Sequence, residues 1–297
     1  MYAGYSEKYE RWGDILLRRP DPQAVWPLFA DGKNVSYDDL PKPNATYVRS
    51  STGGGSWSDL KSVPSSWQIS YDSLGKELRF IIEPTAFKHT GLFPEQAANW
   101  DFCGRLLEDA VSSGRKDIKV LNLFAYTGGA TVACAAHGAA EVVHVDASKG
   151  MINRAKENLS ASGLADKYVR FIAEDCRRFV EREIRRGRRY DGIIMDPPKY
   201  GRGPTGELWE IERSLCEFTE RCSLLLSDDP LFFVVSSYAT ELGPTAVGNV
   251  LDITLNRIVK GQVTSDELGL PISSAVTAEG KKIALPCGQT ARWTPLR

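Results

Sequence analysis

From residue 119 onward, short apolar runs alternate along the chain with segments whose apolar residues have helical spacing. Five runs have the length and composition of buried strands: 120–124, 141–145, 168–172, 192–195 and 231–235. Helical patterns lie between them: 130–137, 149–160, a segment from 176, and 208–226. Strict alternation of this kind predicts a parallel sheet with helices on both faces. Two further runs, 253–263 and 282–285, are interpreted as closing strands.

The first 90 or so residues have a different pattern, rich in Trp, Pro, Gly and Ser, with short β-like runs at 67–71 and 78–82. A helical pattern over 95–111 follows and leads into the alternating region. We therefore expect an α/β protein with a small β-rich N-terminal domain, residues 1–88, and a larger domain, residues 89–297.

The charge balance, the cysteines and the apolar runs indicate which partners and compartments the protein can have. The 297 residues include 37 Lys and Arg against 38 Asp and Glu, which argues against attachment to nucleic acid by bulk positive charge. Six cysteines form no Cys-x-x-Cys pair and have no His at metal spacing, so we expect no metal site and a reducing cytoplasm. Residues 1–10 lack the apolar run of a signal peptide, and polar residues interrupt the uncharged stretch 120–140. We expect neither export nor a membrane span.

A glycine turn follows the first strand of the alternating region. In the segment 124–130, Gly128 and Gly129 let the backbone pass close to a bound molecule and begin the next helix. The alternative is a tight strand-to-helix turn that needs glycine only for its conformation. The segment lacks the Gly-x-Gly-x-x-Gly pattern of nicotinamide enzymes, and no Gly-Lys-Ser/Thr follows it.

Three acidic residues follow the next three strands. Asp146 lies where a carboxylate can bind both hydroxyls of a ribose, and Asp175 lies where it can face an adenine amino group. Each has the alternative role of a helix cap. Asp196 precedes two prolines, which cannot continue the strand and so direct the chain rigidly out of the sheet. Their common position at strand ends favours a nucleoside cofactor.

These segments together resemble class I S-adenosylmethionine-dependent methyltransferases: Val-Leu-Asn-Leu-Phe-Ala-Tyr-Thr-Gly-Gly at 120–129, Asp146, Ala-Glu-Asp-Cys at 173–176 and Asp-Pro-Pro-Lys-Tyr at 196–200. More narrowly, they resemble the bacterial 23S ribosomal RNA methyltransferase group with Tyr-Thr-Gly-Gly and Asp-Pro-Pro-Lys-Phe motifs. The segment 89–96 resembles that group's entry to the cofactor site. The resemblance implies a Rossmann-like sheet of seven strands and the cofactor S-adenosyl-L-methionine.

The resemblance also implies roles for individual residues. It places the methionine part of the cofactor against 125–128, the ribose at Asp146 and the adenine near Asp175. The full set of cofactor-binding residues that it implies is Phe93, Gln96, Asn122, Ala125, Tyr126, Thr127, Gly128, Asp146, Asp175 and Asp196. In the commoner Asp-x-Gly-x-Gly-x-Gly motif, Asn122 replaces the acid, and Phe124 and Tyr126 replace two glycines.

The residues implied to face the methyl group and its acceptor are Asp196, Pro197, Pro198 and Tyr200. Because the sulfonium already activates the methyl group, the enzyme mainly has to position a nucleophile. Asp196 or the Pro197 carbonyl can accept a hydrogen bond from a base nitrogen, and Tyr200 can stack on an extruded base. Some relatives have a nucleophilic cysteine where this chain has Ser237, so we expect chemistry without one.

RNA, in particular ribosomal RNA, is the expected substrate. On a helix, Arg178, Arg182, Arg185 and Arg189 share a face that can meet phosphates, and the alternative is a solvated helix with ion pairs. A protein or small-molecule acceptor, or a catalytically silent cofactor-binding or RNA-binding module, stays open at this point. The sequence leaves the oligomeric state undetermined.

Overall fold

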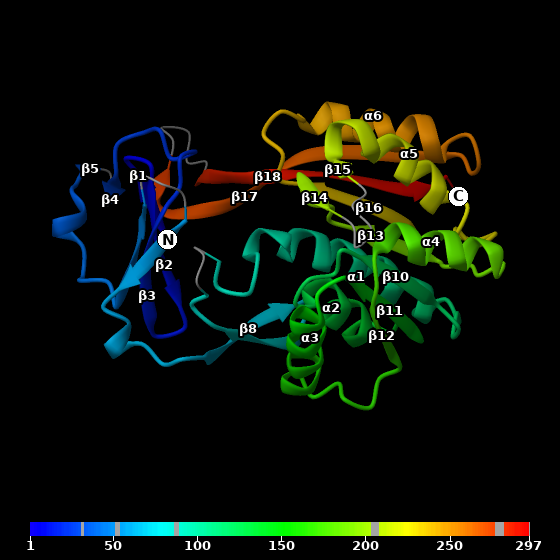
Figure 1. Cartoon of the computed structure of the whole chain (residues 1–297), viewed down its shortest axis with the longest axis horizontal. Helices are drawn as coiled ribbons and strands as arrows, with labels where there is room; N and C mark the ends of the chain where they lie inside the picture. The colour runs from blue at the N-terminus through cyan, green and yellow to red at the C-terminus, as the bar shows by residue number, and fades with distance from the viewer. Residues whose placement is uncertain (31–32, 51–53, 86–88, 203–207, 277–281, 297) are drawn as a thin grey trace. The chain divides into compact units, whose positions relative to one another are not determined.

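The computed structural model describes residues 1–30, 33–50, 54–85, 89–202, 208–276 and 282–296 (Figure 1). The chain divides into two groups of residues in mutual contact. Unit 1 comprises residues 1–70, 80–95 and 269–287, and unit 2 comprises residues 71–79, 96–268 and 288–297. The predicted domain boundary after residue 88, which itself lies outside the described residues, stays a prediction.

A seven-stranded sheet organises unit 2 and has the order β12-β11-β10-β13-β16-β18-β17, with β17 and β18 contributing residues to both units. Its strands are β10 (Lys119–Leu123), β11 (Glu141–Asp146), β12 (Val169–Ala173), β13 (Gly192–Met195), β16 (Phe232–Ser237), β17 (Gly261–Val276) and β18 (Lys282–Pro295). The first five strands in this order pair in parallel, and β18 is antiparallel to β16. Every residue of β13 and β16 is buried, as expected for strands covered on both faces. The predicted seven-stranded α/β sheet is confirmed.

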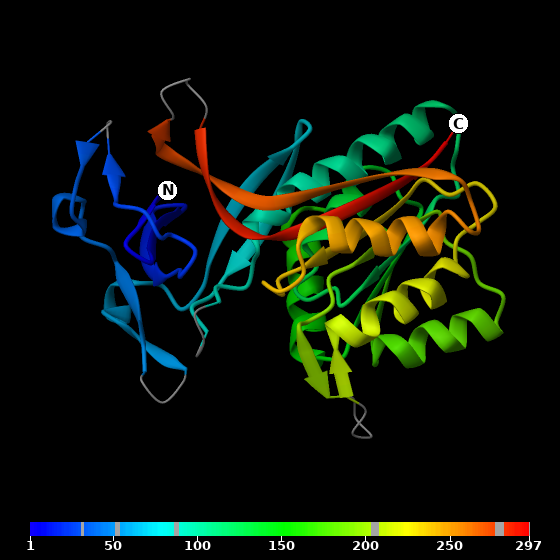
Figure 2. The same ribbon diagram turned by 90° about the horizontal axis from the view of Figure 1, so that it is seen from above.

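Six α-helices of unit 2 cover this sheet: α1 (Ala97–Ser112), α2 (Gly129–Ala136), α3 (Lys149–Ala161), α4 (Cys176–Arg185), α5 (Ile211–Ser223) and α6 (Pro244–Leu255). Helices α1, α2 and α3 pack together on one face, and α4, α5 and α6 pack on the other (Figures 1 and 2). One core cluster joins the sheet to the second group of helices, with Phe179, Phe218, Leu251 and Trp293 among its buried residues. Among the described residues, no helix has the length and apolar character needed to cross a membrane.

Two local predictions were wrong. The chain over 253–260 is not a strand, because α6 occupies Pro244–Leu255 and β17 begins only at Gly261. Gly243 and Pro244 form a helix start, and buried Val247, Leu251 and Leu255 have helical spacing that the strand interpretation overlooked.

The predicted helix 208–226 is shorter, because its first residues form a strand. Strand β15 (Leu208–Glu210) pairs antiparallel with β14 (Tyr200–Arg202), and α5 then runs only over Ile211–Ser223. This hairpin, which follows directly after the Asp-Pro-Pro segment, was not predicted from the sequence.

Unit 1 contains a five-stranded sheet of order β1-β2-β3-β6-β7 and the hairpin β4-β5. These strands are β1 (Tyr2–Gly4), β2 (Glu7–Trp12), β3 (Ile15–Pro20), β4 (Phe29–Ala30), β5 (Lys33–Asn34), β6 (Ala45–Arg49) and β7 (Gly55–Ser58). The hairpin β8 (Trp67–Ser73) and β9 (Lys76–Ile82) contributes residues to both units and contains both predicted N-terminal runs. Three short 3-10 helices occupy Tyr37–Asp39, Leu60–Ser62 and Pro94–Gln96. The predicted β-rich N-terminal region is confirmed.

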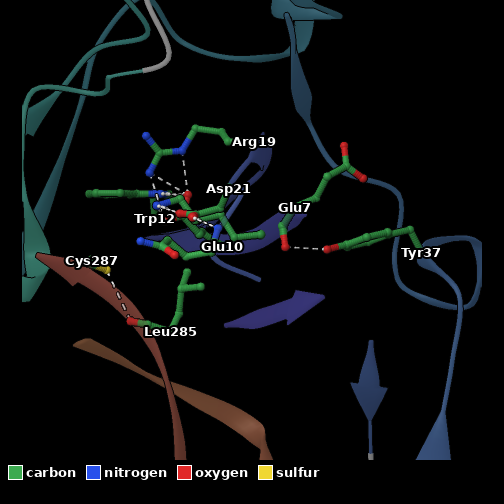
Figure 3. A network of polar contacts seen from close by, with 10 residues as sticks. Glu7, Glu10, Trp12, Arg19, Asp21, Tyr37, Leu285 and Cys287 are labelled. Carbon is green, nitrogen blue, oxygen red and sulfur yellow. Dashed lines mark hydrogen bonds and ion pairs between the residues drawn. The ribbon is translucent and has the colours of Figure 1, made fainter. Parts of the chain in front are cut away.

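Buried charges lie close together in unit 1 (Figure 3). Arg19 donates to both carboxylate oxygens of Glu10, at 2.7 and 2.9 Å, and Lys8 Nζ lies 3.2 Å from Asp21 Oδ2. Glu10, Arg19 and Asp21 are each less than 10% exposed. Burial alone would raise the pKa of Glu10, but Arg19 and Lys8 together lower it below its ordinary value. The network therefore keeps Glu10 ionised inside the unit.

Candidate active site

The candidate site lies at the carboxyl ends of the central strands of unit 2. Strand order reverses at β10, with β11 and β12 on one side and β13 and β16 on the other. Ligands of open α/β sheets bind at the carboxyl edge beside such a reversal. The predicted residues follow these strands: 124–128 after β10, Asp146 at the end of β11, Asp175 after β12 and Asp196 after β13.

The loop after β10 has glycine-like backbone at alternate positions. The φ angles of Phe124, Tyr126 and Gly128 are 54°, 50° and 85°. Positive φ costs a residue with a side chain roughly 1–2 kcal/mol. Phe124 and Tyr126 thus replace the glycines of the commoner motif but keep the conformation that glycine would adopt. Such retained strain is typical of ligand-binding turns.

Backbone hydrogen bonds hold the first part of this loop. The N–H of Phe124 donates to Cys176 Sγ at 3.3 Å, and the N–H of Ala125 donates to the Val145 carbonyl at 3.1 Å. Cys176 is buried, and burial raises the pKa of its thiol far above the ordinary value. The sulfur therefore stays protonated at neutral pH and supports the loop as a weak acceptor.

Asp146 supports the same loop and does not cap the next helix. Its Oδ2 accepts from the N–H of Tyr126 at 2.9 Å, and its Oδ1 accepts from the N–H of Ser148 at 2.8 Å. The cap of α3 is Ser148, whose hydroxyl accepts from the N–H of Met151. The capping alternative for Asp146 is therefore wrong. Each oxygen of a carboxylate has a second lone pair, so each Asp146 oxygen can accept a further hydrogen bond from a ribose hydroxyl.

The end of the loop is fixed by α3. Asn158 is fully buried, and its Nδ2 donates to the Thr127 carbonyl at 2.8 Å. A Cβ on Gly128 would lie 2.9 Å from the Cβ of Ala155 and would be strained at this φ. Glycine at position 128 is thus required both by its conformation and by the close approach of α3.

A buried polar chain lies beneath the loop and was not anticipated from the sequence. Asn122 Nδ2 donates to Thr131 Oγ1 at 2.9 Å, and Thr131 Oγ1 lies 2.9 Å from His144 Nδ1. Burial lowers the pKa of His144 to about 3, although the Tyr126 backbone acts in the opposite direction. His144 is therefore neutral, and its Nδ1 shares a hydrogen bond with the Thr131 hydroxyl. Asn122, which is 3% exposed, thus belongs to the buried polar chain beneath the loop.

Asp175 adopts the alternative role that the sequence allowed. It is the N-cap of α4, and its Oδ1 accepts from the N–H of Arg178 at 3.1 Å. The side chain is half-buried. Its predicted position beside adenine stays a prediction.

Asp196 and Gln96 are brought together, with two further residues that were not predicted from the sequence. Gln96 Nε2 donates to Asp196 Oδ2 at 3.3 Å and to the Tyr238 hydroxyl at 3.1 Å. Gln96 Oε1 accepts from Asn99 Nδ2 at 2.8 Å. The only sequence signal for Asn99 and Tyr238 is their place, one turn after Gln96 and directly after β16.

The prolines direct the chain out of the sheet as expected. Pro197 is buried and Pro198 is exposed, and the Pro198 carbonyl accepts from Trp209 Nε1 at 2.6 Å. Trp209 lies on β15, so the missed hairpin anchors the Asp-Pro-Pro turn. Tyr200 begins β14 and is 55% exposed, which leaves its ring available for stacking.

The serines at the end of β16 are a buried polar strand end. Ser236 Oγ donates to Gln96 Oε1 at 3.2 Å, whereas Ser237 Oγ accepts from the N–H of Ala239. Both are at most 2% exposed. Chemistry without a cysteine nucleophile stays a prediction. Phe93 belongs to unit 1, and its cofactor contact likewise stays a prediction.

The arginine face on α4 is shorter than predicted. Arg189 lies beyond the helix, because Gly187 with φ 61° ends it. Arg182 pairs with Glu174, and Arg221 of α5 binds Glu181 through two hydrogen bonds of 2.7 and 2.8 Å. The structure therefore shows the helix with ion pairs that the sequence left as the alternative.

The loop and Asp146 fit an adenosine-containing cofactor. The glycine-like backbone at 124–128 allows close approach, and the Asp146 carboxylate is half-buried at the end of β11. Among the described residues, no three His, Cys, Asp or Glu side chains are arranged to hold a metal ion.

Comparison with known proteins gives the family. The family model described as S-adenosylmethionine-dependent methyltransferase matches residues 58–231. The crystal structure of a SAM-dependent methyltransferase from Agrobacterium tumefaciens is 33% identical, with a TM-score of 0.87, over all of this chain and 90% of that one. A putative methyltransferase complexed with SAH has the same fold at 18% identity and a TM-score of 0.70, over 98% of this chain and 72% of that one.

Two curated relatives are larger proteins named ribosomal RNA large subunit methyltransferase K/L. The Shewanella frigidimarina protein is 33% identical over 150 residues, 50% of this chain and 20% of that protein. The Methylococcus capsulatus protein is 30% identical over 183 residues, 61% of this chain and 24% of that protein. This chain thus spans about a fifth to a quarter of their length. With the fold, the carboxyl-edge site and the matched residues together, the chain belongs to the S-adenosylmethionine-dependent methyltransferase family.

Proposed function

We propose that this protein transfers a methyl group from S-adenosylmethionine to a base nitrogen of ribosomal RNA in the cytoplasm. The observation that supports the reaction is the position of the Asp196 carboxylate directly after β13. The carboxylate accepts a hydrogen bond from Gln96 Nε2, which also donates to the Tyr238 hydroxyl. The support for the substrate is the name of the curated relatives, ribosomal RNA large subunit methyltransferase K/L, which match 50% and 61% of this chain.

The cofactor side of the site is the loop after β10 with Asp146. In this proposal the backbone of 125–128 contacts the methionine part, and the two Asp146 oxygens bind the ribose hydroxyls. Asp175 and Phe93 border the adenine and the cofactor entry. When bound, S-adenosylmethionine would supply an electrophilic methyl group on a sulfonium and would leave as S-adenosylhomocysteine, while the acceptor nitrogen would lose a proton.

The acceptor side is the Asp-Pro-Pro turn. Asp196 and the Pro197 carbonyl accept hydrogen bonds from the nitrogen that receives the methyl group, which orients its lone pair for in-line attack. A carboxylate beside the reacting nitrogen also stabilises the positive charge that develops there during transfer. Tyr200, with its exposed ring, stacks on the base.

Transfer of labelled methyl groups tests both halves of this proposal. The purified protein is incubated with labelled S-adenosylmethionine and either ribosomal RNA from cells lacking the protein or the total protein of those cells. We expect label in RNA, and much less with RNA from cells that retain the protein, since the site is already methylated there. Label in the protein fraction alone would reject RNA as the substrate.

A further inference from the structure

Asn99 lies at the centre of a buried chain of hydrogen bonds that ends at Asp196. It is 3% exposed on the first turn of α1. Its Oδ1 accepts from Arg292 Nε at 2.7 Å and faces the Thr290 hydroxyl at 3.2 Å. Two donors from β18 therefore meet one side of this amide.

The guanidinium determines which way the Asn99 amide points. Arginine can only donate hydrogen bonds, so the atom that faces Arg292 Nε must be the oxygen. The Asn99 NH2 group then faces the other way, and it donates to Gln96 Oε1 at 2.8 Å and to Ser236 Oγ at 3.1 Å. The orientation of one amide thus follows from the chemistry of its neighbour and is independent of how oxygen and nitrogen are assigned.

The same logic determines the Gln96 amide. Two donors, Asn99 Nδ2 and Ser236 Oγ, face its oxygen, so its NH2 group must face Asp196 and Tyr238. All four hydrogen-bonding positions of Gln96 are then used within the protein.

We propose that Asn99 is a positioning residue for methyl transfer, which fixes the Gln96 amide so that its NH2 group faces the Asp196 carboxylate. This inference rests on the proposed function. A Gln96 amide turned the other way would place an oxygen against that carboxylate and disfavour its ionised form. The fixed orientation therefore keeps Asp196 as an acceptor for the nitrogen that receives the methyl group.

Asn99→Asp tests this inference with little change in shape. Aspartate still accepts from Arg292 but cannot donate to Gln96 Oε1, so the Gln96 amide turns over. We expect kcat to fall ~10- to 100-fold, as for a misplaced catalytic group, with a smaller change in the KM for S-adenosylmethionine. The acidic limb of the kcat profile moves to higher pH.

Asn158→Asp is the matched control, because Asn158 is also a buried asparagine that donates through Nδ2, in its case to the cofactor loop. It is expected to raise the KM for S-adenosylmethionine without moving the pH profile. The pair Arg292→Lys and Arg292→Met provides a second test that leaves Asn99 intact. Lysine is also donor-only and retains most of kcat, whereas methionine lowers it.

A readout without RNA separates this inference from the proposed function. The side-chain NH2 resonance of Gln96, assigned by its loss in Gln96→Glu, is followed by NMR during a pH titration. In the wild-type protein it reports the titration of Asp196, and in Asn99→Asp or Arg292→Met this response is lost or shifted. An unchanged response in both variants, or an unchanged kcat and pH profile with RNA, would overturn the role of Asn99. If the wild-type protein methylates no RNA, the proposed function fails and the NMR titration still decides the role of Asn99.

Discussion

Two buried polar clusters, one in each unit, are built in different ways. In unit 1, the buried charges Glu10, Arg19 and Asp21 lie together with half-buried Lys8, and the four charges neutralise one another. In unit 2, the polar groups between Arg292 and Asp196 are neutral amides and hydroxyls. Opposite charges attract from many directions, whereas an amide has a donor side and an acceptor side. Paired charges are therefore sufficient where buried groups only have to stabilise the fold. Amides are needed where a hydrogen-bond donor must face a particular atom.

The largest expected effect comes from removing the group at the end of the amide chain. Asp196→Ala should lower kcat about 1,000-fold, since it removes both the acceptor for the reacting nitrogen and the charge beside it. Binding of S-adenosylmethionine, measured by calorimetry, should fall much less than kcat. Full activity of the variant would place the acceptor site elsewhere.

Removing a charge from unit 1 should cost stability and leave the chemistry intact. Glu10→Gln should lower the free energy of unfolding by ~3 kcal/mol at pH 7, because Arg19 and Lys8 lose their buried partner. The folded-state pKa of Glu10 is lowered, so its contribution is present above its ordinary pKa of 4.5 and is lost as the pH falls through the folded value.

Urea unfolding of the wild type and of Glu10→Gln between pH 7 and pH 3 checks that the stabilisation by Glu10 is lost in acid. The difference between them should shrink below about pH 4.5. Glu7→Gln is the matched control, since Glu7 pairs with Arg18 at a partly exposed position and should change stability by less than about 1 kcal/mol. Equal effects of the two variants, or a difference that grows in acid, would contradict the account of the buried network.

At the cofactor side the expected effect is smaller and falls on affinity. Asp146→Asn keeps the shape but removes the charge and one acceptor oxygen. We expect ~10- to 100-fold weaker binding of S-adenosylmethionine, from charge-assisted hydrogen bonds of ~1.5–3 kcal/mol. Asp39→Asn, which changes a carboxylate that accepts from the Ser36 N–H in unit 1, serves as comparison. If calorimetry finds equal losses for both, Asp146 has no special part in the binding of ribose.

The smallest effect isolates the strain in the loop after β10. Tyr126 has φ 50°, where glycine is favoured over alanine by about 1 kcal/mol or more. Tyr126→Gly should therefore be more stable than Tyr126→Ala. At exposed Tyr168, which is absent from the positive-φ residues, the order should reverse. Denaturant unfolding of the four variants checks this. If the alanine variant is the more stable one at both positions, the loop is unstrained.

Much of unit 2 could be predicted from the sequence, because strands buried on both faces are continuous apolar runs. The strands β10, β11, β12, β13 and β16 all lie within a residue or two of the predicted runs. The β14-β15 hairpin was missed, because its pairing depends on how the chain leaves the sheet after Pro198. Helix α6 was missed although its sequence contains a helix start at Gly243 and Pro244.

For the site, motif positions could be predicted and the supporting contacts could not. Phe124 and Tyr126 occupy positions of motif glycines, but their residue types disfavour glycine-like angles, and the contacts of the loop with Asp146 and Cys176 hold the turn. Asn99 and Arg292 are separated by 193 positions in the sequence. No local pattern relates them, because only the pairing of β18 with β16 and the packing of α1 bring them together.

The most direct test of the central claim is the nucleoside composition of ribosomal RNA. RNA from cells with the protein, without it, and without it but supplied with either wild type or Asp196→Ala is digested and compared by mass spectrometry. We predict that one N-methylated nucleoside is lost without the protein, returns with the wild type and does not return with Asp196→Ala. An unchanged set of methylated nucleosides in all four samples would contradict the claim that this protein methylates ribosomal RNA.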